Sequence, residues 1–114
     1  MTTPLTQERI AEHQIACRRS NNRIFRTAEQ LALTTPIPFI CECADTACTE
    51  IVQLNAVEYQ AVRRHPRGFF NITGHEAPSV KAGAERIVAV ISDFTMVMKI
   101  GVAGERATEA SNRK

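Results

Sequence analysis

The sequence has no tryptophan, a single tyrosine and no long run of apolar residues. Its longest apolar segment, residues 87–91, is far shorter than the roughly 20 residues that a membrane-spanning helix needs. The first residues also lack the basic and apolar regions of a secretory signal peptide. We therefore expect a cytoplasmic protein with reduced thiols and no membrane partner, so disulfide bonds are the weaker interpretation of its cysteines.

Net charge is also small, because 14 Lys and Arg residues against 12 Asp and Glu residues leave +2 over 114 residues. This balance does not by itself indicate a nucleic-acid-binding protein. The charge is unevenly distributed, however. Residues 36–60 contain four acidic residues and no basic one, whereas residues 61–72 contain three arginines and no acidic residue. The length and the ordinary composition indicate one globular domain.

The hydrophobic pattern predicts that this domain spans residues 1–100 and begins with a long helix over residues 4–33. Thr3 is expected to cap the helix, and Pro4 suits its first position. The apolar stripe of this helix favours packing on the chain's own core over a coiled-coil partner. The stripe consists of Ile10, Cys17, Ile24, Phe25 and Leu31, with Gln14, Asn21 and Ala28 at the intermediate positions. Residues 101–114 are expected to form a tail that is loosely ordered, or helical only on contact.

Short apolar segments after residue 36 predict a small antiparallel sheet of about four to five strands, which makes the fold α+β. The strand at 86–91 is expected to be central because it is apolar on both faces. One further short helix is expected to follow Asn55, because Asn55 and Glu58 form a capping-box pattern. Val57 and Ala61 are expected to face inward, with Val62 as a further candidate. Residues 73–78 are expected to form a loop. The other predicted strands are residues 39–43, 50–54, 69–72 and 95–100.

Three of the four cysteines form the pattern C-x-C-x4-C, at Cys41, Cys43 and Cys48. Alternate residues of a strand project to the same side, so the first two thiols can converge and the following loop can return the third. Three thiolates suit zinc, which requires a fourth ligand. His75 is the best candidate, because it follows a glycine in a loop, whereas Cys17 or water are alternatives. Such a site would hold one structural zinc ion.

Other interpretations of the cysteines stay open. They could be small core residues, as Cys17 is expected to be, or Cys43 and Cys48 could form a redox pair. Cys48 with His75 and Asp45 could also be the nucleophile, base and orienting group of an enzyme, or zinc could keep a water ligand. The sequence contains no phosphate-loop, dinucleotide-binding or H-E-x-x-H motif, so a non-enzymatic zinc module is favoured over a thiol- or zinc-dependent enzyme.

Two groups of arginines are candidate partner-binding residues. One group shares a face of the long helix, and the other follows the short helix. Either group could contact the phosphates of a nucleic acid or an acidic partner, or it could simply be solvated. We expect a protein partner, reached through the N-terminal helix or this basic edge; nucleic-acid binding and self-association through the helix are the alternatives. The residues are Arg19, Arg23 and Arg26 with Arg18 beside them, and Arg63, Arg64 and Arg67.

Several segments of the chain also follow a recognisable pattern. They are Asn21-Asn22-Arg23-Ile24-Phe25-Arg26, Phe39-Ile40-Cys41-Glu42-Cys43-Ala44-Asp45 with Cys48, Glu58-Tyr59, Val62-Arg63, Gly74-His75-Glu76, and Val97-Met98-Lys99 with Gly101. In these segments the chain resembles a group of small, uncharacterised bacterial proteins, from which it departs at Asn22 and Glu29. The resemblance implies a shared fold and ties the three clustered cysteines and His75 into one pattern, but it supplies no activity. The cysteine spacing also resembles that of the post-SET zinc segment of histone methyltransferases, over residues 41–48 only.

Overall fold

A computed structural model of the chain describes residues 6–112 and confirms the α+β fold with its long N-terminal helix. Five strands form two antiparallel sheets rather than one. The elements in chain order are α1 (Gln7–Gln30), β1 (Ile37–Ile40), β2 (Ile51–Leu54), α2 (Ala56–Arg63), β3 (Gly68–Ile72), α3 (Ala77–Lys81), β4 (Glu85–Ile91), β5 (Phe94–Lys99) and α4 (Gly101–Asn112).

Helix α1 begins later and ends earlier than the pattern predicts. Thr6 caps it, because its hydroxyl accepts a hydrogen bond from the backbone N–H of Arg9 at 3.2 Å. The expected cap and first position, Thr3 and Pro4, lie outside the described residues. The helix ends at Gln30, before a turn in which Ala32 has a φ of 50°. None of the described helices combines the length and apolar composition that crossing a membrane requires.

The two sheets differ in size and position. Strands β1 and β2 form a hairpin, and the larger sheet has the order β3-β5-β4. Strand β4 is therefore an edge strand, and the expectation that it is central is wrong. Four of its apolar side chains are exposed, and a register shift between Ile87 and Ala89 interrupts its pairing with β5. The central position belongs to β5, which pairs with strands on both sides.

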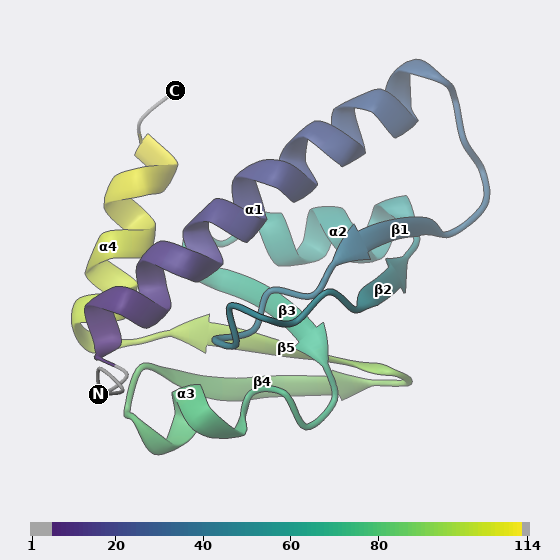
Figure 1. Cartoon of the computed structure of the whole chain (residues 1–114). Helices are drawn as coiled ribbons and strands as arrows, with labels where there is room; N and C mark the ends of the chain where they lie inside the picture. The colour runs from purple at the N-terminus through teal and green to yellow at the C-terminus, as the bar shows by residue number, and fades with distance from the viewer. Residues whose placement is uncertain (1–5, 113–114) are drawn as a thin grey trace.

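The long helix crosses above the three-stranded sheet, with α4 beside its first half and the β1–β2 hairpin beneath its second half (Figure 1). Helix α3 lies below, next to β4. Two buried clusters follow this division. One joins the hairpin to α2 and contains the stacked rings of Phe25, Phe39 and Tyr59. The other joins the first half of α1 to α4 and to the sheet, around Ile10 and Phe69.

Residues 101–112 form the helix α4 and pack against α1, so the expectation of a loosely ordered tail is wrong for these residues. The buried side of α4 consists of Ala103, Gly104 and Ala107. A Cβ atom at Gly104 would lie only 2.8 Å from the carbonyl oxygen of Lys99. The start of α4 can therefore lie this close to the end of β5 only because residue 104 has no side chain. Such small residues give a weak hydrophobic pattern, which explains why the sequence did not indicate this helix.

Several side chains face differently from the predicted pattern. On α1 the polar residues Gln14 and Asn21 are fully buried, whereas Leu31 is 64% exposed. The capping box that opens α2 is confirmed, but this helix buries Tyr59 and Val62, while Val57 and Ala61 face the solvent. Helix α3 lies partly where a loop was expected.

Candidate metal centre

The first two cysteines of the motif lie just beyond β1, which ends at Ile40 instead of reaching residue 43. Their segment joins the two sheets. The backbone N–H of Cys41 donates to the carbonyl of Glu50 at 3.1 Å, and that of Glu42 donates to the carbonyl of Phe70 in β3 at 3.0 Å. Cys41 and Cys43 are both buried. This extended segment therefore places the two thiols between the hairpin and the larger sheet.

A compact turn returns the third cysteine to the same point. The Asp45 carboxylate accepts a hydrogen bond from the backbone N–H of Ala47 at 2.9 Å, and the Asp45 carbonyl accepts one from Cys48 at 3.1 Å. Aspartate favours such turns because its side chain can bond to the backbone two residues later. Cys48 is half-buried.

The loop after β3 supplies the histidine. Gly74 has a φ of +101°, a conformation that side chains other than glycine rarely adopt, and nothing crowds this position. The backbone N–H of His75 donates to the carbonyl of Ile72 at 2.9 Å, which closes the turn. The backbone N–H of Gly74 donates to the Glu76 carboxylate at 3.2 Å. This turn directs the imidazole towards the cysteines.

The four side chains converge as the sequence predicted. Their nearest ligand atoms all lie within 4.8 Å of one another. Nδ1 of His75 lies 3.6 Å from Sγ of Cys41 and 3.7 Å from Sγ of Cys48. Tetrahedral zinc holds sulfur at about 2.3 Å and nitrogen at about 2.0–2.1 Å, which places the two ligand atoms about 3.6 Å apart. The spacing is therefore that of two ligands sharing one tetrahedral ion.

The thiols affect one another's ionisation. The pKa of Cys43 is lowered to about 5, chiefly because Cys41 donates a hydrogen bond to it. The same hydrogen bond, with burial, raises the pKa of Cys41, and burial raises that of Cys48. The cluster by itself thus favours one thiolate and two neutral thiols. A bound divalent cation would stabilise all three thiolates, because coordination deprotonates a thiol.

The second ring nitrogen of His75 has a carboxylate partner. Nε2 lies 3.4 Å from Oε2 of Glu50, which immediately precedes β2. With Nδ1 directed at the cysteines, a proton on Nε2 can bond to this carboxylate, and such a partner orients a ligating histidine. Glu42 and Glu76, the carboxylates next to the proposed ligands in the sequence, do not take this place. Glu76 bonds to the loop backbone, and Glu42 is fully buried on the other side of the cysteine segment.

Glu42 attaches the cysteine segment to α1 and α2. Its carboxylate accepts from Asn21 Nδ2 at 2.8 Å and from the backbone N–H of Phe70 at 3.2 Å, and it pairs with Arg63. Asn21 also exchanges two hydrogen bonds of 2.8 Å with the backbone of Ile40. Burial raises the pKa of Glu42, while the positive charge of Arg63 opposes this shift. No local pattern indicated this network, because its partners lie far apart in the sequence.

Cys17, the alternative fourth ligand, lies outside the cluster. Its Sγ is 3.7 Å from Nε2 of His13 on the same helix. Burial is the main cause that raises the pKa of Cys17 to about 11. Its thiol therefore stays protonated at neutral pH, as a half-buried core cysteine does.

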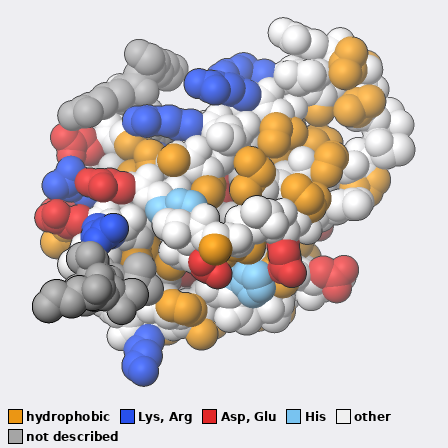
Figure 2. Space-filling model, in the orientation of Figure 1, with side chains coloured by type: hydrophobic (Ala, Val, Ile, Leu, Met, Phe, Trp, Pro, Cys, Tyr) orange, Lys and Arg blue, Asp and Glu red, His pale blue; other side chains and the backbone are white. Residues whose placement is uncertain are grey.

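The arginines fall into different groups from those the sequence indicated. Those of α1 and Arg63 line one pocket together, whereas Arg64 and Arg67 do not line it. Arg67 instead donates to the hydroxyl of Thr108 at 3.0 Å and so connects β3 to α4. On the face shown in Figure 2, most Lys and Arg side chains lie towards α1 and α4, with a further one at the lower edge, whereas hydrophobic side chains gather over the end of α1 and the hairpin.

No protein-family model matches the chain, and no curated protein or solved structure is significantly similar to it. The assignment of the centre therefore rests on its own geometry and chemistry.

Proposed function

We propose that the protein is a small zinc-binding module in which Cys41, Cys43, Cys48 and His75 hold one structural zinc ion. The observation that carries this proposal is the convergence of their ligand atoms within 4.8 Å. Three thiolates and one imidazole complete a tetrahedral shell, which is typical of structural rather than catalytic zinc. The ion would connect the segment after β1, the turn before β2 and the loop after β3.

A non-enzymatic role is part of the proposal. The alternative set of Cys48, His75 and Asp45 lacks its orienting group, because Nε2 of His75 faces Glu50 and Asp45 bonds to the turn backbone. A catalytic zinc ion needs a position open to water, whereas four protein donors surround this one.

Cobalt substitution tests the centre directly. Titration of the metal-free protein with Co²⁺ should produce one equivalent of the visible absorption that tetrahedral thiolate coordination gives, and zinc should then displace it. Cys43→Ser should reduce the thiolate-to-cobalt bands and the affinity, whereas Cys17→Ser, a matched change outside the cluster, should leave both unchanged. A spectrum of octahedral cobalt, or equal effects of the two variants, would refute the proposed ligand set.

We also propose that the module engages another protein. Support comes from the edge strand β4, where Ile87, Val88, Val90 and Ile91 are between 39% and 60% exposed. Large apolar side chains that the fold leaves exposed are candidates for an interaction surface. The apolar face of α1 is less suited to this role, because Ile10, Ala11, Ile15 and Ala28 are buried within the chain. Self-association through α1 stays a prediction.

Site-specific cross-linking tests this surface. A photoreactive amino acid in place of Val90 should give one specific protein adduct in cells, whereas the same residue in place of the exposed Gln60 on α2 should not. Adducts of equal yield at both positions, or none at either, would contradict the proposal; an adduct with a second copy of the chain would mean self-association.

A further inference from the structure

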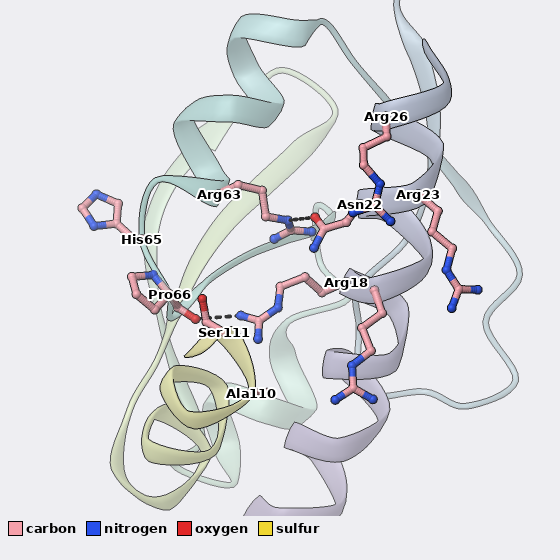
Figure 3. A pocket seen from close by; sticks show the side chains of 10 residues that line it. Arg18, Asn22, Arg23, Arg26, Arg63, His65, Pro66, Ala110 and Ser111 are labelled. Atoms are coloured by element: carbon pink, nitrogen blue, oxygen red, sulfur yellow. Dashed lines mark hydrogen bonds between the residues drawn. The ribbon is translucent and has the colours of Figure 1, made fainter. Parts of the chain in front are cut away.

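Four arginines of α1, together with Arg63 at the end of α2, line a pocket of about 620 Å³ (Figure 3). This volume lies in the range of small-molecule sites. Helix α1 forms one wall, the turn after α2 another, and the end of α4 the third. The lining contains five arginines and no acidic residue. The arginines are Arg18, Arg19, Arg23, Arg26 and Arg63.

Two of these arginines are held in place by the fold. Arg18, which is 6% exposed, donates to the carbonyls of Pro66 at 2.7 Å and of Ala107 at 3.0 Å. Arg63 reaches across from α2 in the opposite direction and donates to Asn22 at 3.2 Å (Figure 3). Its guanidinium is also fixed by contacts to Glu42, to the carbonyl of Gly68 and to the hydroxyl of Tyr59. Rigid donors of this kind favour binding because little conformational freedom remains to be lost.

The positive charge of the pocket is largely uncompensated. Glu42 neutralises Arg63, but Arg18 contacts carbonyl oxygens rather than a carboxylate. Burial, followed by the nearby Arg63, lowers the pKa of Arg18 to about 10, so it stays charged at neutral pH. Arg19, Arg23 and Arg26 are exposed and, within residues 6–112, make no ion pair or side-chain hydrogen bond. An anion in the pocket would therefore meet several guanidinium groups that have no competing acid.

The arrangement also limits the kind of anion. Guanidinium groups bind phosphate oxygens with two parallel hydrogen bonds. Arg19 and Arg26 are seven residues apart and so are separated by about 10 Å along the helix axis, which a single phosphate group does not span. The lining contains no Phe, Tyr or Trp ring on which a nucleobase could stack. A bound nucleic acid would in addition extend beyond a pocket of this size.

We infer that this arginine pocket binds a small molecule that carries a chain of two or more phosphate groups. The inference is independent of the zinc centre, because none of the four proposed ligands lines the pocket.

Calorimetric titration of the zinc-loaded full chain tests this inference with inorganic orthophosphate, diphosphate and triphosphate as probes at low ionic strength. Affinity should rise at least tenfold from orthophosphate to triphosphate, and ATP should bind no more tightly than triphosphate. Arg19→Gln and Arg23→Gln should each weaken triphosphate binding by about tenfold, since each removes a charge-assisted hydrogen bond to a phosphate oxygen. Both side chains are exposed, so the melting temperature should not change.

Arg64→Gln is the matched control, because Arg64 is exposed nearby but does not line the pocket. It should change triphosphate affinity less than twofold. Absence of triphosphate binding, or equal effects of Arg23→Gln and Arg64→Gln, would overturn the inference. The inference would also be overturned if a single-stranded oligonucleotide bound more tightly than triphosphate and all three substitutions weakened its binding equally. That result would instead identify a nucleic-acid-binding face.

Discussion

Nδ1 of His75 lies 3.6 Å from Sγ of Cys41, although 34 positions separate the two residues in the chain. Cys41 follows the hairpin strand β1, and His75 follows β3 of the other sheet. A metal ion between them would therefore add a link between two parts of the fold that also meet through the extended segment after β1 and through the contact of Phe39 with Phe70. In a domain this small, such a link contributes directly to the stability of the fold.

The carboxylate beside the histidine provides the first prediction. Glu50→Gln should weaken zinc binding by about 10–100-fold, because it removes the charged partner that orients His75 and raises its basicity. The fold should be retained, since Glu50 is largely exposed. Competition with a zinc-binding dye measures the affinity. Glu12→Gln, which alters an exposed carboxylate on α1, serves as the control and should have no effect.

Arg63 is expected to be essential for stability, since it compensates the buried charge of Glu42. Arg63→Met should lower the free energy of unfolding by about 3–5 kcal/mol, and the exposed neighbour change Arg64→Met by less than about 0.5 kcal/mol. Urea denaturation of both variants measures the difference. Equal stability of the two would contradict the buried ion pair.

The deficit of Arg63→Met should also depend on pH. Without Arg63, nothing equivalent opposes the effect of burial, which raises the pKa of Glu42. A carboxyl group with a raised pKa in the folded state binds its proton more tightly there than in the unfolded chain, so stability falls as the pH rises. The loss of unfolding free energy relative to the wild type at the same pH should therefore be largest near neutral pH. It should shrink as the pH is lowered towards about 4.3, the ordinary pKa of Glu. A deficit that is constant over this range would exclude the charge as its cause.

The reactivity of the thiols distinguishes ligands from core residues. In the zinc-loaded protein, alkylation should occur slowly and at Cys17 only, because zinc protects the three ligating cysteines. The rate should rise about tenfold per pH unit between pH 7 and 10, since the pKa of Cys17 is raised to about 11 and only the thiolate reacts. Peptide mass spectrometry locates the modified residue. Fast labelling of Cys48, with Cys17 protected, would mean that Cys17 is a ligand in its place.

The close packing of α4 predicts the effect of a single methyl group. Gly104→Ala should destabilise the protein by about 1–3 kcal/mol, because the new atom would meet Arg67 at 2.6 Å and the Lys99 carbonyl at 2.8 Å. Glu105→Ala on the exposed side of the same helix should be nearly neutral. Thermal unfolding measures both, and a neutral Gly104→Ala would mean that α4 packs less tightly.

The features that sequence predicts well here are those specified by local chemistry. The capping box at Asn55 and Glu58 opens α2 as predicted, and the turn-forming residues around Asp45 and Gly74 bring the cysteines and His75 together. Three thiols and an imidazole by themselves limit the metal ions that the cluster suits. The spacing of a metal motif thus indicated a site before any fold was known.

The features that sequence misses depend on partners distant in the chain. The apolar composition of β4 suggested a central strand, but pairing placed β5 there. Gln14 and Asn21 interrupt the apolar stripe of α1, yet both are fully buried because they bond to the segment around Glu42. The pairing of Arg63 with Glu42 was also hidden, since no acidic residue lies near Arg63 in the sequence. Local patterns cannot show such long-range compensation.

The metal content of the purified wild-type protein tests the central claim most directly. Native mass spectrometry, combined with a melting curve in the presence and absence of a strong chelator, measures both binding and its contribution to stability. If Cys41, Cys43, Cys48 and His75 hold a structural ion, the protein should carry one zinc ion per chain, and its melting temperature should fall markedly when the chelator removes it. A chain that carries no zinc after exposure to excess zinc, and that melts at the same temperature with chelator, would contradict the central claim.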